Sequence, residues 1–237
     1  MKKTLLILTI TSISLANTFA RDISEKKNLV GFTAGFSLNT MGLQKNSTYD
    51  NSKNTIKPGG VFGINYEYRA PKVFGFEIGV NYANRGTQQK LEDPNLNRSF
   101  FRLNFHSVEV PVIAKFYIGK KKIFNLNVGG FASYAFNVQS RLKVDFKNSA
   151  ITDQDERVNS VLKDNNDKDI NGNRPFRPFD AGVNVGFEFV SKSGFGAGAR
   201  VQQGLVDFTN PKFDFGPFVE NKKVFHTNAI VYALFKI

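Results

Sequence analysis

Seven charged residues lie inside segments that are otherwise rich in apolar side chains: Glu67, Arg69, Glu77, Glu109, Lys115, Glu188 and Arg200. Unpaired charges strongly destabilise an apolar core, so carboxylates and cations of this kind are expected to pair with one another across a shared interior. Such a charge network indicates either a packed ionic core or a narrow, gated passage. A small β-barrel is filled by its own side chains, which favours the packed core.

A second candidate for ion chemistry is a polar run that matches the first half of an EF-hand loop: Asp167, Lys168, Asp169, Ile170, Asn171 and Gly172. Alternating oxygen ligands followed by a glycine suit calcium. The twelfth position, however, is Pro178, where the motif requires a bidentate glutamate, and no flanking helices are indicated. Asp167, Asp169 and Asn171 are therefore a calcium candidate, with a plain solvated loop as the alternative.

The sequence does not indicate catalysis. The chain has no cysteine and only two histidines, His106 and His226. Two histidines cannot form a three-histidine zinc site, and neither has a serine or aspartate partner at a recognisable spacing. We expect no enzymatic activity, no resident metal and no cofactor.

The elements that must position the charges are eight segments in which apolar and polar residues alternate. In residues 179–190, Val183, Val185, Phe187 and Phe189 share one face, whereas Glu188 lies on the other. This period of two is typical of a β-strand with two chemically different faces. The eight predicted strands are residues 28–39, 60–69, 73–86, 100–118, 123–144, 179–190, 194–208 and 224–237.

The connections between these strands alternate between long and short. Short connections lie near residues 70–71, 119–122 and 191–193, and long ones span about 40–59, 87–99, 145–178 and 209–223. Even strand number, short turns on one side and long loops on the other are typical of bacterial outer-membrane barrels. The pattern predicts an all-β protein: an eight-stranded antiparallel up-and-down transmembrane β-barrel with short periplasmic turns and long outer loops. A switch of apolar parity between Phe105 and Val108 predicts a β-bulge near His106 or Ser107.

Alternation alone does not show which face of the sheet contacts water, because the strands of soluble lipocalin-like barrels also alternate apolar and polar residues. A soluble periplasmic barrel that binds a hydrophobic ligand is therefore an alternative. Charges deep in the strands favour a polar interior and a lipid-facing exterior. Aromatic residues near the strand ends, where interfacial girdles would lie, favour it as well: Tyr66, Tyr68, Tyr82, Phe116 and Tyr134.

Residues 1–20 have the pattern of a secretory signal peptide, with Lys2 and Lys3 followed by a short apolar run and small residues. Cleavage is expected after Ala20 or after Ala16, and residues 21–237 would form the barrel domain. The formal net charge is +12, but the basic residues do not gather with exposed aromatics, so nucleic-acid binding is disfavoured. The expected location is the outer membrane of a Gram-negative bacterium, reached by the general secretory route.

Residues 106–119 (His-Ser-Val-Glu-Val-Pro-Val-Ile-Ala-Lys-Phe-Tyr-Ile-Gly) resemble a strand of the PorT-family outer-membrane β-barrel proteins. Residues 127–136 resemble the strand that follows in that family, and residues 179–189 and 196–208 resemble its last hairpin. The resemblance implies an OmpA-like eight-stranded barrel in the outer membrane. One departure is the terminus, because such barrels usually end on an aromatic residue and this chain ends on Ile237, with Phe235 nearby.

These observations predict location and architecture better than activity. The expected role is a structural anchor whose long loop at 145–178 offers a surface for a protein partner. Some members of the PorT family take part in secretion across the envelope, so the resemblance implies a secretion-associated version of this role. A narrow porin-like passive channel is the alternative within the membrane. Lipid is the expected partner of the outer face, and the oligomeric state is not indicated.

Overall fold

The computed structural model describes residues 22–42, 52–91, 99–147, 154–161, 177–207 and 225–237. They form ten β-strands: β1 (Asn28–Gly42), β2 (Ser52–Thr55), β3 (Lys57–Arg69), β4 (Phe74–Leu91), β5 (Ser99–Ile118), β6 (Phe124–Val144), β7 (Gln154–Val161), β8 (Phe179–Val190), β9 (Phe195–Gly204) and β10 (Phe225–Lys236). The predicted signal peptide and the calcium candidate (Asp167, Asp169 and Asn171) lie outside the described residues. No helix in the described part of the chain is long and apolar enough to cross a membrane.

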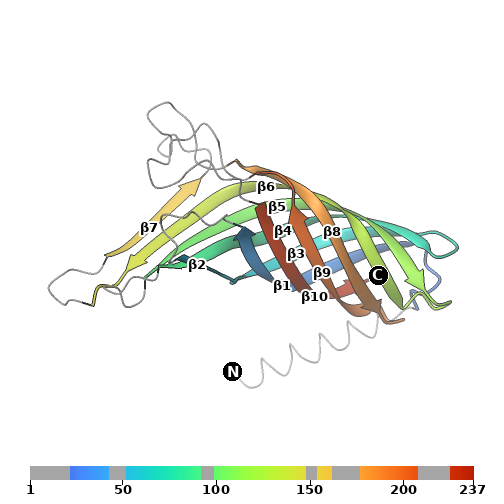
Figure 1. Cartoon of the computed structure of the whole chain (residues 1–237). Coiled ribbons are helices and arrows are strands. Elements are labelled where there is room, and N and C mark those ends of the chain that lie inside the picture. The colour runs from blue at the N-terminus through green and yellow to red at the C-terminus, as the bar shows by residue number, and fades with distance from the viewer. Residues whose placement is uncertain (1–21, 43–51, 92–98, 148–153, 162–176, 208–224) are drawn as a thin grey trace, which may run out of the picture.

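Eight of these strands close into a ring. The antiparallel neighbours follow the order β1, β3, β4, β5, β6, β8, β9 and β10, and β10 returns to β1. The closing pair is in register from Gly31 opposite Lys236 to Gly42 opposite Phe225. Figure 1 shows these strands from the side, as arrows that run obliquely across the molecule. The predicted eight-stranded antiparallel barrel is therefore confirmed, and the short turns occur at residues 70–73, 119–123 and 191–194 as expected.

Two strands lie in segments that the sequence predicted to be loops. β2 pairs with the end of β4, and β7 pairs with the end of β6, at the long-loop end of the barrel. Figure 1 shows both at the end of the molecule opposite the C-terminus. The predicted loops at 40–59 and 145–178 were therefore wrong in part, because β4, β5 and β6 run past the ring and their free edges are paired by these added strands. We call this part of the sheet the extension.

The barrel is apolar outside and polar inside. Phe36 is 80% exposed, whereas the next residue, Ser37, is 3% exposed. The same alternation exposes Val183, Val185, Phe187 and Phe189 and buries Glu188. Large hydrophobic side chains cover the outside of every strand of the ring, as the prediction of a lipid-facing exterior requires.

An irregularity occurs where the sequence predicted it, but on the neighbouring strand. The β5–β6 register shifts between His106 and Ser107, which pair with Asn137 and Ala135, so the extra residue is Phe136 on β6. β5 itself keeps one parity, and Phe105 is buried inside the barrel rather than facing out. The apparent switch on β5 arises because apolar residues line the interior near the extension. The bulge also turns Val138 to the inside, although strict alternation after the exposed Tyr134 and Phe136 would place it outside.

The short-turn end of the barrel is covered by the segment before β1. Ile23 is buried, and its backbone N–H donates to the Lys192 carbonyl oxygen at 3.0 Å. Its carbonyl oxygen accepts a hydrogen bond of 3.0 Å from the Arg69 guanidinium. Beside it, the Lys122 ammonium donates to the carbonyl oxygen of Ala70 at 2.7 Å, and burial lowers the pKa of this lysine. This end of the interior is therefore closed by protein.

Candidate functional site: the charged interior

The largest polar assembly inside the barrel lies near the short turns. We call it the lysine cluster, and its charged members are Glu67, Arg69, Glu77, Lys115, Glu188, Arg200 and Lys236, all of them buried. The strands place them together because each lies on an inward-facing position, close to the short-turn end of its strand for all but Arg200, which lies in the middle of β9. Six of these seven residues belong to the charge network predicted from the sequence, and Lys236 is new.

Two lysines hold the cluster together. The Lys115 ammonium lies 2.9 Å from a carboxylate oxygen of Glu67 and 2.6 Å from one of Glu188, and it also pairs with Glu77. The Lys236 ammonium pairs with Glu67 and lies 3.1 Å from Glu188 and 3.4 Å from Glu77. Each cation therefore serves the same three carboxylates, which come from three different strands.

Arginine and tyrosine side chains complete the cluster. The Arg69 guanidinium lies 2.5 Å from Glu67, and Arg200 lies 3.8 Å from both Glu77 and Glu188. The Tyr117 hydroxyl donates to Glu67 at 2.8 Å, and the Tyr232 hydroxyl donates to Glu188 at 2.9 Å. These contacts satisfy the carboxylate oxygens from several directions, which is the condition under which buried charges are tolerated.

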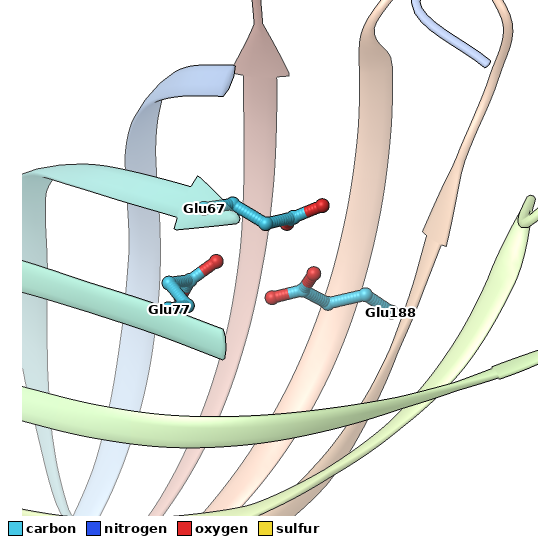
Figure 2. A group of neighbouring side chains, drawn as sticks. All are labelled: Glu67, Glu77 and Glu188. Carbon is cyan, nitrogen blue, oxygen red and sulfur yellow. The ribbon is translucent and has the colours of Figure 1, made fainter. Parts of the chain in front are cut away.

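The three glutamates point toward one another across the lumen, as Figure 2 shows. One oxygen atom from each of Glu67, Glu77 and Glu188 lies within 4.8 Å of the other two. Three carboxylates at this separation could ligate a cation. Lys115 and Lys236 already supply two ammonium groups to the same oxygens, so the cluster is neutralised by the chain's own side chains. The arrangement supports a structural ionic core rather than a metal centre.

A second cluster lies farther along the interior, toward the long loops. We call it the arginine cluster, and it consists of Arg85, Glu109, Asp180 and His226. Arg85 pairs with Glu109 and lies 3.9 Å from Asp180, whose carboxylate is 2.8 Å from the His226 ring. The guanidinium also stacks over the Phe131 ring at 4.9 Å from its centroid.

The structure corrects the predicted network at Glu109. Instead of joining the lysine cluster, Glu109 accepts hydrogen bonds from Gln202 at 3.1 Å and Asn81 at 3.3 Å and pairs with Arg85. Arg85 and Asp180 were missed, although continuing the alternation of Glu77 and Glu188 along β4 and β8 would have placed both inside. The error arises because the alternation of a strand shows which face a residue occupies but not how far along the barrel it lies.

Between the two clusters is a small cavity. Its volume is about 20 Å³, roughly the room that a single water molecule needs. It is lined by side chains of both clusters and by neighbours: Glu77, Arg200, Tyr232, Glu109, Asn81 and Asn65. These side chains fill the middle of the barrel, and Ile23 covers its short-turn end.

A closed ring of eight long strands, apolar outside and ionic inside, defines an integral β-barrel protein of the outer-membrane type. The chain belongs to the outer membrane protein beta-barrel domain family, which it matches over residues 17–210. The outer membrane is therefore its location, and lipid is the partner of its outer face.

Several solved structures are similar to this chain. Ail, the attachment invasion locus protein of Yersinia pestis, is 12% identical, with 89% of this chain and 99% of that chain covered and a TM-score of 0.43. Neisserial surface protein A is 14% identical, with 88% and 97% covered and a TM-score of 0.43. OprG of Pseudomonas aeruginosa is 10% identical, with 89% and 96% covered and a TM-score of 0.40. No curated protein matches the chain at a significant level.

Proposed function

We propose that this protein is a non-catalytic outer-membrane anchor that carries a binding surface on its extension. The observation that carries the proposal is the closed interior. Seven buried charged side chains and two tyrosine hydroxyls interlock across the lumen, and Ile23 covers the short-turn end. A permeation path would have to separate several buried ion pairs, and each such separation costs about 3–5 kcal/mol.

The extension supports the second half of the proposal. β4, β5 and β6 continue beyond the ring and, with β2 and β7, form a five-stranded sheet at the long-loop end. Rigid strands that project from a barrel can position a surface for recognition more firmly than loops alone. We propose that the short turns are periplasmic and that this sheet faces outward from the cell.

Export and family role belong to the same proposal. We propose that residues 1–20 are removed as a signal peptide, with cleavage after Ala20 or Ala16, which N-terminal sequencing of the mature protein would test. The resemblance of residues 106–119 and 127–136 to PorT-family strands supports a secretion-associated partner for the extension. The calcium candidate at Asp167, Asp169 and Asn171 stays a prediction from sequence.

Conductance measurements test the anchor against the channel. The purified protein should give no steady current above that of a protein-free planar bilayer, because the lysine cluster fills the lumen. A general porin reconstituted in the same way is the positive control. Reproducible single-channel steps with this protein would contradict the proposal and favour the narrow porin-like channel.

The orientation can be tested cleanly because the chain has no native cysteine. Lys147→Cys places a thiol at an exposed position on the extension, and Lys121→Cys places one at an exposed position in a short turn. On intact cells, a membrane-impermeant maleimide should label the first variant and reach the second only after permeabilisation. The reverse pattern would refute the proposed orientation, and a protein that stays soluble without detergent would favour the periplasmic ligand-binding barrel.

A further inference from the structure

The outer face of the extension carries positive charges that directly oppose one another. Arg102 of β5 is opposite Arg141 of β6. In the adjacent row, Phe100 lies between Lys90 of β4 and Lys143 of β6. Like charges placed directly opposite in a sheet are destabilising, so this arrangement has a cost that the barrel alone does not explain.

The two arginines are held in place from the side. Their guanidinium carbons lie over the same Phe100 ring, 5.2 Å from the centroid for Arg102 and 5.6 Å for Arg141. Arg102 also donates two hydrogen bonds to the amide oxygen of Gln88, at 2.7 and 3.0 Å. Stacking on an aromatic ring orders a guanidinium, and the contacts with Gln88 and Asp155 use only the Nε and Nη2 groups, so the Nη1 groups of both arginines are left for an anion.

Carboxylates offset this charge only in part. Arg141 forms a two-pronged ion pair with Asp155, at 2.7 and 2.9 Å, and Lys143 lies 2.9 Å from Asp145. Among the residues described on this face, Lys90 and Arg102 are not paired with a carboxylate. The face therefore keeps an excess of positive charge around Arg102.

The position of this face relative to the lipid-facing surface identifies the kind of anion. The outward residues of β5 change from Val108, in the apolar belt, through His106 and Asn104 to Arg102. Six residues at about 3.3 Å each, on a strand tilted by roughly 45°, put Arg102 about 14 Å above Val108. Polar headgroups of an ordinary phospholipid bilayer extend only about 5–8 Å beyond the hydrocarbon core. The charges thus lie at the level of a larger, saccharide headgroup.

We propose that Lys90, Arg102, Arg141 and Lys143 bind the phosphorylated saccharide headgroup of an outer-leaflet glycolipid. We call these four residues the basic face. Planar guanidinium groups match phosphate oxygens in a two-pronged geometry, and the apolar belt below them holds the acyl chains of the same lipid. The inference rests on the proposed function, because it requires the extension to face outward.

The test compares two charge-matched double variants of the purified exported protein, folded in detergent. Arg102→Gln/Arg141→Gln removes two cations from the basic face, and Lys120→Gln/Lys121→Gln removes two from an exposed short turn. Binding of purified lipopolysaccharide with a phosphorylated core is measured by titration at low and high salt. The arginine double variant should bind at least about tenfold more weakly than wild type, and the lysine double variant should match wild type.

Three further probes identify the ligand source. Enzymatically dephosphorylated lipopolysaccharide should bind wild type weakly, and phosphatidylglycerol nanodiscs and inorganic phosphate should not compete. Equal binding by the arginine double variant, or equal affinity for phosphatidylglycerol or free phosphate, would overturn the inference. Loss of binding in the lysine double variant alone would place the lipopolysaccharide site at the short turns and overturn the inference, whereas failure of the proposed orientation itself would appear in the cysteine labelling of intact cells.

Discussion

The two interior clusters solve the same problem, buried charge in a narrow barrel, in different ways. In the lysine cluster, Lys115 and Lys236 each contact the same three carboxylates, so every glutamate has more than one cationic partner. In the arginine cluster, Arg85 is the cation shared by Glu109 and Asp180, and His226 and Phe131 complete its surroundings.

This difference suggests separate roles. The lysine cluster ties β3, β4, β5, β8 and β10 together near the short turns. The arginine cluster lies nearer the extension. There, neutral amides also stabilise a buried carboxylate, because Gln202 and Asn81 both donate hydrogen bonds to Glu109. We therefore expect the lysine cluster to carry more of the barrel's stability. The following substitutions test that ranking, from the largest expected effect to the smallest.

Lys115→Met should have the largest effect. It leaves three carboxylates within 4.8 Å of one another and removes one of the two ammonium groups between them. Removing one partner of a buried ion pair typically costs about 3–5 kcal/mol, and the free energy of unfolding in detergent should fall by about that amount. Denaturant titration monitored by the heat-dependent shift in gel migration measures it, with the exposed Lys121→Met as the matched control. Equal midpoints for the two variants would refute the ranking.

Adding Glu77→Gln to Lys115→Met should recover part of the lost stability. The amide removes one negative charge from the trio while keeping the side chain's size, so the remaining Lys236 faces two carboxylates instead of three. The double-mutant cycle should give a coupling of about 1–3 kcal/mol, as residues in one ion-pair network do. Additive losses would mean that Glu77 and Lys115 do not act together.

Arg85→Met should destabilise the barrel less, by about 2–3 kcal/mol. Glu109 keeps its hydrogen bonds from Gln202 and Asn81, and Asp180 keeps His226 as a neighbour, so neither carboxylate is left without a polar contact. The same denaturant titration checks this. A loss larger than that of Lys115→Met would reverse the comparison between the clusters.

Phe131→Leu should have the smallest effect that can still be measured. It keeps an apolar side chain against His226 and removes the aromatic face under Arg85, whose attraction is worth about 0.5–2 kcal/mol. Combined with Arg85→Met, it should add little, because the cation that the ring serves is already gone. A fully additive double variant would show that Phe131 acts through packing alone.

The sequence by itself determined the architecture. Alternation assigned eight strands, and residues 179–190 were bounded without error. It also assigned Glu67, Glu77, Lys115 and Glu188 to the inside, because a strand has only two faces and a one-residue error would put charges in lipid. The alternation of short and long connections predicted that the tight turns lie together at one end of the barrel and the long loops at the other.

Only the tertiary structure decided which charges meet. Glu109 and Glu188 share the inner face, yet one joins Arg85 and the other Lys115 and Lys236. Their partners depend on the stagger between neighbouring strands and on closure of β1 against β10, and neither is written in the parity of a single strand. The strand that carries the bulge, β6 at Phe136, and the added strands β2 and β7 could not be predicted for the same reason, since each depends on the register of a neighbouring strand.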